Sequence, residues 1–573
     1  MAITMLRSAF RTLPLAATIT FVSACGSDTT PKPTPEPEVT YAAPPASVVV
    51  EEGAVKIRRE VFLVPGVKPP KNPVATANAE TPAELNFVRV IRYRVDADPP
   101  KPARAIAVLM PGFLGGAGSY DPMARAIVRR STADDALEAW AIDRRGNLLE
   151  DHHGLEVAQV KKDPELALSY YFDEAQVEEK KFKGFLQPDE VAFESEWGLA
   201  TTVGDLAKVI AHVPEADRKA RVVLVGHSLG ASIVEEYAAW DFDGKPGYAE
   251  LAGLVLIDGM TRNEGAAALP VTKDEYLKGK SAGLLSVPGL DAVRAGTPYV
   301  ALPFLGLDIY PIAAITAMRS RLSPEKIVKD PYRDKAFLTL LSLSTVPKMT
   351  NRGAMGLAFD NESNGISFAA VSCGTSKGGA TESYASLLGV TLSHPSDDDA
   401  TYDWVEYDQV NPKEHTSIED IARSWYEGPG LDFAEWYFPA RLSADAPAAG
   451  TLVLKPGDWP LDEQGLRAMH GAAMDLPILG AVAGLVNDVK ALEPLRALVK
   501  DVPIGPGRPL AGKPRTTEDA FRVLDITALT HIDPLSGTDA GGGIVPQWYN
   551  ALTTWMKVNT PAGGVVVSAQ TAP

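Results

Sequence analysis

Apolar residues follow two patterns along the chain, and each pattern predicts a different kind of β-strand. Segments 55–64 and 86–95 alternate apolar with charged side chains, which is typical of antiparallel strands that expose one face to water. Segments 105–110, 222–225 and 251–257 are continuously apolar, as are strands buried on both faces of a parallel sheet. Together they predict an α/β protein with a mostly parallel sheet and antiparallel strands at one edge.

The parallel pattern stops after segment 251–257 and returns only near Leu476. This interval is far longer than an ordinary loop, so we expect an inserted cap domain over residues 263–445. The cap would interrupt a core made of residues 46–262 and 446–573.

A sharp turn is predicted directly after strand 222–225, where the chain reads GHSLG at residues 226–230. Glycines before and after the serine allow the backbone to turn abruptly from strand to helix. Residues 231–240 have a helical pattern, so the Ser228 hydroxyl and the Leu229 N–H would lie at the positive end of a helix. A serine in that position can act as a nucleophile beside a donor that stabilises negative charge.

The stretch VVLVGHSLGAS resembles the nucleophile elbow of the α/β-hydrolase superfamily, and further landmarks extend from about residue 105 to residue 557. The resemblance implies the α/β-hydrolase fold, with a serine, an acid and a histidine in that order along the chain. It assigns the nucleophile to Ser228. The pattern G-x-S-x-G recurs as GTSKG around Ser376 inside the predicted cap. This second copy has no glycine-rich loop and no late histidine of its own. We expect Ser228, not Ser376, to react.

Segment 105–110 runs into the glycine-rich sequence PGFLGG at residues 111–116. In the superfamily this strand ends in a loop whose backbone N–H, with the N–H after the nucleophile, forms the oxyanion hole. The resemblance thus assigns the two donors to Phe113 and Leu229. Pro-Gly replaces the usual His-Gly opening, and a purely structural turn is the alternative interpretation.

The base is expected near the C-terminus. Segment 523–529 predicts the last strand, and 545–557 predicts the closing helix. His531 lies just after that strand, where the superfamily keeps its catalytic histidine. A histidine in a surface loop is the alternative. Asp143, in a DRRG turn similar to the D-x-R-G turn of the superfamily, precedes the nucleophile and is interpreted as part of the scaffold.

Two aspartates are candidates for the acid. Asp488 follows segment 476–484, which resembles the penultimate strand, and this is the usual superfamily location. Its other interpretation is a helix cap. Asp258 directly ends strand 251–257, and some lipases of the superfamily carry their acid there, although a turn residue would read the same way. We favour Asp488 and keep Asp258 as the alternative.

No metal or organic cofactor is expected. His152 and His153 lie in an EDHHG sequence without a second ligand cluster at a recognised spacing, so we predict a surface loop there. A net charge of −18 disfavours nucleic-acid binding. The cysteines are Cys25 and Cys373, so no disulfide framework can form if Cys25 is modified.

The N-terminus has the pattern of an export signal. Residues 1–24 carry Arg7 and Arg11, then an apolar run, then small residues before Cys25. VSAC followed by glycine resembles a bacterial lipobox, which implies cleavage before Cys25 and lipidation of that residue. A plain secretory signal is the alternative. Residues 25–45 are rich in proline and predict an extended tether. We therefore expect an exported protein, held on a bacterial membrane by its lipid anchor.

The superfamily resemblance implies a serine hydrolase that cleaves carboxylic esters, with a small-molecule or lipid-like ester as its substrate. A serine peptidase or amidase of the same fold is the nearest alternative. A catalytically silent lipoprotein that binds a ligand with its cap is the alternative from a different class. Epoxide and haloalkane chemistry is disfavoured because those relatives place aspartate where Ser228 stands. The patterns predict no oligomeric state.

Overall fold

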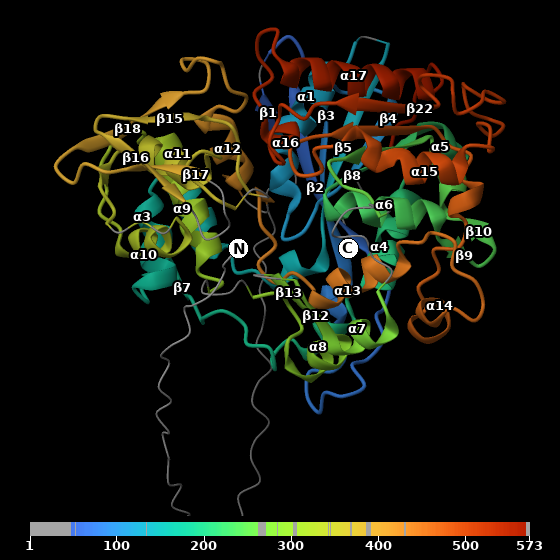
Figure 1. The fold of residues 1–573 in the computed structure, drawn as a ribbon, viewed down its shortest axis with the longest axis horizontal. Coiled ribbons are helices and arrows are strands. Elements are labelled where there is room, and N and C mark those ends of the chain that lie inside the picture. The colour runs from blue at the N-terminus through green and yellow to red at the C-terminus, as the bar shows by residue number, and fades with distance from the viewer. Residues whose placement is uncertain are drawn as a thin grey trace, which may run out of the picture. The chain divides into compact units, whose positions relative to one another are not determined.

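The computed structural model describes residues 47–568 except 52, 133, 262–270, 283–284, 302–305, 342, 344, 367–368, 386–390 and 429–430 (Figure 1). The predicted signal, tether and Cys25 lie outside the described residues. The chain from Ala43 onward forms one compact unit, and the division into core and cap domains stays a prediction. Within the described part, no helix combines the length and the apolar character needed to cross a membrane.

A nine-stranded sheet is the largest assembly of strands among the described residues, in the order β1-β2-β3-β5-β4-β8-β11-β21-β22. The first four strands of this order pair antiparallel, and all pairs from β5 to β22 are parallel. This confirms the predicted mostly parallel sheet with an antiparallel edge. The strands are β1 (Ser47–Glu51), β2 (Ile57–Pro65), β3 (Phe87–Val95), β4 (Ala103–Met110), β5 (Ala136–Asp143), β8 (Val222–His227), β11 (Gly253–Ile257), β21 (Ile478–Val482) and β22 (Phe521–Asp525).

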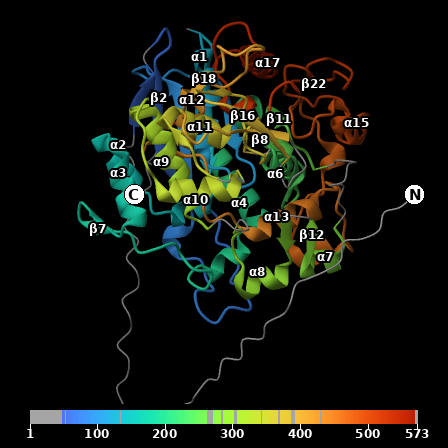
Figure 2. The same cartoon turned by 60° about the vertical axis from the view of Figure 1, so that its left-hand side comes forward.

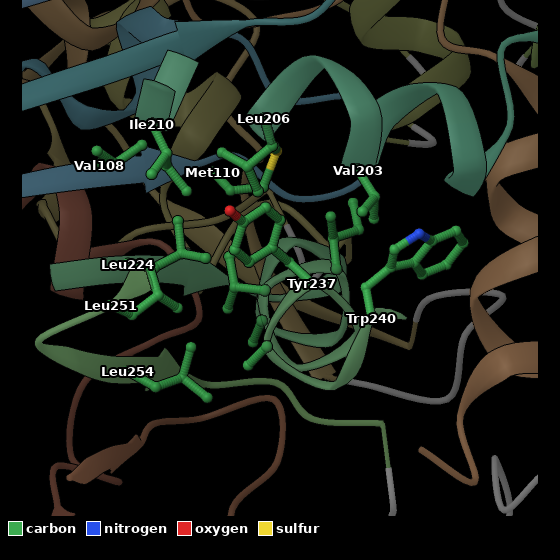
Figure 3. Close-up of a cluster of buried hydrophobic side chains, with 14 of the residues drawn as sticks. Val108, Met110, Val203, Leu206, Ile210, Leu224, Tyr237, Trp240, Leu251 and Leu254 are labelled. Atoms are coloured by element: carbon green, nitrogen blue, oxygen red, sulfur yellow. The ribbon is translucent and has the colours of Figure 1, made fainter. Parts of the chain in front are cut away.

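Helices cover both faces of the sheet, and successive residues of β8 point to opposite faces. Val222 and Leu224 pack with α4 (Leu199–Ala211) and α6 (Leu229–Ala239). Val223 and Val225 pack with α1 (Asp121–Arg129) and α17 (Ile544–Asn559). Figure 3 shows side chains of the first cluster, with Val108 and Leu224 from the sheet and Tyr237 from α6. Because β8 is buried on both faces, it gives rigid support to the residue that follows it.

The chain between β11 and β21, here called the insertion, packs in two groups. Helices α7, α8 and α13 contribute to the cluster on the sheet, through residues such as Tyr276, Leu290 and Leu442. Helices α9, α11 and α12 form a separate cluster with α2 and α3, which precede the elbow in the chain. Figures 1 and 2 both show α7 and α8 apart from α9 and α11.

The elements of the insertion are α7 (Lys273–Lys278), β12 (Gly279–Ala282), β13 (Leu285–Pro288), α8 (Leu290–Gly296), α9 (Ile309–Leu322), α10 (Pro331–Leu340), β14 (Lys348–Met349), α11 (Asn351–Phe359), β15 (Gly374–Lys377), β16 (Thr381–Ala385), β17 (Thr391–Pro395), β18 (Thr401–Glu406), α12 (Ile418–Trp425), β19 (Tyr426–Gly428), β20 (Leu431–Asp432), α13 (Ala440–Ala449) and α14 (Trp459–Gln464). The remaining elements are α2 (His153–Lys161), α3 (Pro164–Phe172), β6 (Gln176–Val177), β7 (Lys180–Lys181), α5 (Glu215–Arg221), β9 (Asp241–Phe242), β10 (Lys245–Pro246), α15 (Glu493–Val499) and α16 (Asp533–Ser536), with short 3₁₀ turns between them.

The last strand ends earlier than its apolar pattern predicts. β22 ends at Asp525, whose carboxylate accepts hydrogen bonds from the Thr527 N–H at 3.1 Å and hydroxyl at 2.7 Å. This local turn stops the strand, so His531 lies in a loop of several residues between β22 and α16. The closing helix α17 is present as predicted.

Candidate active site

Ser228 lies at the bend between β8 and α6, in a backbone conformation that non-glycine residues rarely adopt. Its φ is 55° and its ψ is −126°, a combination that costs free energy and persists only where the surroundings impose it. The Ser228 N–H donates to the Ile257 carbonyl of the neighbouring strand at 2.9 Å. The serine is partly exposed and stands at the N-terminus of α6. The predicted elbow is therefore present in the fold.

Close backbone approaches explain the glycines around the elbow. A Cβ atom at Gly226 would lie 2.2 Å from the Gly230 carbonyl oxygen, and one at Gly230 would lie 2.2 Å from the Met110 oxygen. Gly259 is equally constrained, because its Cβ would lie 2.2 Å from the Ser228 oxygen. Only hydrogen fits at these positions, so the end of β4, the elbow and the end of β11 meet without side chains between them.

His531 and Asp258 form a buried pair next to the elbow. His531 Nδ1 lies 2.7 Å from Asp258 Oδ2, and the two residues are only 4% and 1% exposed. The Asp258 carboxylate also accepts backbone N–H bonds from the turn after β21 at 2.9, 2.9 and 3.1 Å. Among the described residues, no hydrogen bond joins the Ser228 hydroxyl to the His531 ring, a contact that often tightens only when substrate binds.

The surroundings of Asp258 keep it ionised. Burial opposes the charge, but the hydrogen bond from His531, the electrostatic attraction of that ring and the backbone N–H groups lower the pKa of Asp258 below its ordinary value. A carboxylate only accepts hydrogen bonds, so the proton on the His531 ring is at Nδ1. His531 Nε2 is then available to take a proton.

Asp488, the acid favoured from the sequence, does not take part in this arrangement. It is exposed and precedes the 3₁₀ helix η7 (Val489–Leu492), where its carboxylate accepts from the Lys490 N–H at 2.9 Å. This is the helix-capping interpretation. The geometry therefore favours Asp258 over Asp488, because β11 lies directly beside β8 and Asp258 is the first residue after β11.

His227 is a site residue that the sequence interpretation did not use. Its Nε2 donates to the His531 carbonyl oxygen at 2.9 Å, and the two rings lie 4.3 Å apart. Burial and the nearby charge of His531 lower the pKa of His227 to about 3, so it stays neutral. His227 could have been identified from the sequence by its position, one residue before the serine.

The glycine-rich loop (residues 111–116) lies against the elbow, since a Cβ at Gly112 would be 2.8 Å from Ser228 Cβ. Arg144 holds this loop by donating to the carbonyl oxygens of Pro111 at 2.7 Å and of Gly112 and Gly115 at 2.9 Å. Glu435 pairs with the same guanidinium at 2.8 Å. The structure thus places the loop that carries Phe113 next to Ser228 and Leu229.

Residues of the insertion fix two loops of the site. In the glycine-rich loop, the Gly116 N–H donates to the Phe433 carbonyl at 2.6 Å, and the Glu435 N–H donates to Leu114 at 2.8 Å. At the end of the His531 loop, where α16 begins, buried Asp533 accepts from the Thr416 hydroxyl at 2.6 Å and from the Ser372 N–H at 3.1 Å. The insertion is therefore part of the support of the site.

The other candidates have structural surroundings. Ser376 lies within β15 and pairs with Trp404, so it is not at a strand-to-helix turn. Asp143 accepts from Arg89 at 2.7 Å and from the Ala117 N–H at 2.6 Å, as expected of a scaffold residue. The surface loop predicted at His152 is wrong, because His152 is only 7% exposed and lies beside Glu150.

A cavity of about 720 Å³ lies away from these residues. Arg104, Arg508 and Lys557 line it. Arg104 stands at the start of β4, whereas Ser228 follows the end of the parallel neighbour β8. This pocket therefore lies at the opposite ends of the strands from Ser228.

The chain was compared with protein families, curated proteins and solved structures. The model of the "Alpha/beta hydrolase family" matches residues 107–348, and no curated protein matches the chain. Similar solved structures include a thermophilic esterase from Thermogutta terrifontis (11% identity, 86% of this chain and 99% of that chain, TM-score 0.30). An epoxide hydrolase from Vigna radiata is also similar (14% identity, 82% of this chain and 94% of that chain, TM-score 0.33). So is a soluble variant of monoglyceride lipase from Saccharomyces cerevisiae (12% identity, 92% of this chain and 98% of that chain, TM-score 0.27). Similarities this low do not indicate an activity. The chain has the α/β-hydrolase fold, and the family match supports its place among the α/β-hydrolases.

Proposed function

We propose that the protein hydrolyses carboxylic esters through an acyl-enzyme on Ser228. One observation carries the proposal: a buried Asp258–His531 pair, 2.7 Å apart, stands beside a serine held in a strained elbow. These are the three groups of a Ser-His-Asp triad, in the chain order of this fold.

In the proposed reaction, Ser228 Oγ attacks the ester carbonyl while His531 Nε2 takes its proton. The Leu229 and Phe113 N–H groups would bind the oxyanion, each contributing about 3 kcal/mol to transition-state stabilisation. The intermediate releases the alcohol, which receives its proton from His531. Water then attacks the acyl-enzyme by the same route, which releases the acid and restores Ser228. Asp258 would hold the His531 ring in place and stabilise its charged form. The reaction requires no metal or cofactor.

The direct test is hydrolysis of nitrophenyl esters of increasing acyl length, with aminoacyl anilides assayed in parallel. We expect ester cleavage, loss of it in Ser228→Ala, and unchanged rates in the matched Ser376→Ala. Cleavage of anilides with higher kcat/KM than esters would instead identify an amidase. No cleavage of either class by a folded protein would favour a silent binding protein.

We also propose export and lipid attachment at Cys25, which would hold the enzyme at a bacterial membrane. The charged start, short apolar run and VSAC sequence support this proposal. A lipid-like or small ester at that surface would be the substrate.

A further inference from the structure

Three potential metal ligands converge in the interior, outside the proposed active site. Glu150 follows the 3₁₀ helix η3 (Arg145–Leu149), His152 caps α2, and Asp432 ends β20. Each is buried, and one ligand atom of each lies within 4.8 Å of the others. Two come from the chain before the elbow and one from the insertion, so only the fold brings them together.

The ligand atoms of His152 and Glu150 lie directly against each other, and that of Asp432 is nearby. His152 Nε2 lies 2.8 Å from Glu150 Oε2 and 3.4 Å from Asp432 Oδ2. This spacing allows an ion pair when His152 is protonated, but within the described residues neither Nε2 nor Oε2 makes a hydrogen bond of good geometry. A buried polar atom without a well-formed hydrogen bond destabilises the fold. A cation bound between His152 Nε2 and Glu150 Oε2 would be coordinated by both atoms.

Trp436 orients both carboxylates. Its backbone N–H donates to Glu150 Oε1 at 2.7 Å, and its indole N–H donates to Asp432 Oδ2 at 2.9 Å. Donors of this kind fix metal-binding carboxylates in known metal sites. With Oε1 engaged, Glu150 Oε2 remains directed at the histidine.

We propose that Glu150, His152 and Asp432 bind a divalent cation, with Zn²⁺ as the best fit. One imidazole nitrogen and two carboxylate oxygens are a donor set that Zn²⁺ accepts, with a fourth position left for water. Ca²⁺ and Mg²⁺ require more oxygen ligands and no imidazole. The cation would also balance two buried carboxylates. Without an ion, a charged His152 would have to do so.

The site would support the glycine-rich loop rather than take part in the chemistry. Asp432 precedes Phe433 and Glu435, the residues that pair with Gly116 and Leu114. An ion that joins Asp432 to residues 150–152 would therefore lock this strand of the insertion against the core. The binding itself does not depend on the proposed ester hydrolysis.

The test is metal analysis and thermal unfolding of the purified full-length protein, dialysed after incubation with ZnCl₂. We expect about one zinc per chain, a lower Tm after chelation, and recovery of Tm with zinc. His152→Gln should bind little zinc and show no Tm response. His153→Gln is the matched control. The His153 ring is bonded to the Val177 carbonyl at 3.0 Å and lies outside the cluster.

Trp436→Phe provides a second test if His152→Gln does not fold. It keeps an aromatic side chain but removes the indole N–H that donates to Asp432, so zinc affinity measured against a chromophoric chelator should fall about 10–100-fold. The proposal is overturned if the wild type retains no stoichiometric zinc, or if His152→Gln or Trp436→Phe binds zinc as tightly as the wild type.

Discussion

At the scale of single residues, the choice between two aspartates decides how the histidine is held. Asp258→Asn should lower kcat by up to about 10⁴-fold, because His531 would lose the carboxylate that fixes its tautomer and stabilises its charge. Asp488→Asn is the matched control and should keep the wild-type rate, since Asp488 only caps a short helix. Kinetics with circular dichroism on both variants measure this. A collapse in Asp488→Asn with activity kept in Asp258→Asn would show that our choice is wrong.

The sequence indicates the serine and the histidine better than the acid. Ser228 can be identified by the glycines on either side of it, which the fold needs because a side chain would collide with nearby backbone. His531 can be identified by its place after the last strand. Asp258 carried a signal as well, because it ends a well-defined strand and is followed by Gly259, which must approach Ser228 closely. The contacts of His227 and Arg144 could not be predicted, since their partners are carbonyl groups that only the fold brings near.

At the scale of elements, the elbow depends on the absence of side chains where three strand ends meet. Gly230→Ala would place a methyl group 2.2 Å from the Met110 oxygen. We expect a loss of about 1–3 kcal/mol in the free energy of unfolding and loss of activity as the glycine-rich loop shifts. The matched variant is Gly542→Ala, where a Cβ atom meets nothing within 4 Å. Urea unfolding compares them, and equal stability of both variants would contradict the argument.

The turn η4 (Ala192–Glu196) contains two buried glutamates, Glu194 without an ion-pair partner among the described residues and Glu196 with one. They allow a test of how the stability of the fold depends on pH. Burial, and then the charge of Glu435, raise the pKa of Glu194 well above its ordinary value of 4.5. The folded chain thus keeps a proton that the unfolded chain releases, so Glu194 makes the free energy of unfolding fall as pH rises above 4.5. Glu194→Gln should remove this loss and raise Tm more at pH 8 than at pH 5.

Glu196 is the matched control for that variant. It pairs with Arg294 at 2.6 Å and also with Arg441. Glu196→Gln should therefore destabilise the fold, because it removes the carboxylate that pairs with Arg294 and one of the two carboxylates that pair with buried Arg441, the other being Asp445. A lower Tm for Glu194→Gln at both pH values would contradict the assignment of Glu194 as an unpaired group.

Most strands could be predicted because burial on both faces produces continuous apolar runs, whereas the end of β22 depends on a local Asp525 turn. The packing of α2 and α3 with α9 and α11 could not be predicted. This packing depends on contacts between segments that lie on either side of the elbow in the sequence. Such contacts produce no periodic pattern of apolar residues.

At the scale of the whole molecule, the insertion supports both loops of the proposed active site, so it cannot be a detachable lid. Asp533 and Glu435 are the connections. The sequence predicted an inserted cap domain over residues 263–445, but not its contacts with the two loops.

The N-terminal prediction also concerns the whole molecule. We expect the mature chain to begin at Cys25 and to carry a lipid there, because the preceding residues have the pattern of a lipoprotein signal. Intact-mass measurement of the membrane fraction tests this. A mature chain that begins elsewhere, or an unmodified Cys25, would contradict it.

The central claim is that Ser228 is an activated nucleophile in an acyl-transfer site. Labelling the full-length protein with a fluorophosphonate, followed by peptide mapping, tests it most directly. The account predicts one modified serine, Ser228, with labelling abolished in Ser228→Ala and strongly slowed in Asp258→Asn. Labelling of Ser376 instead, or no labelling of the folded wild-type protein, would contradict it.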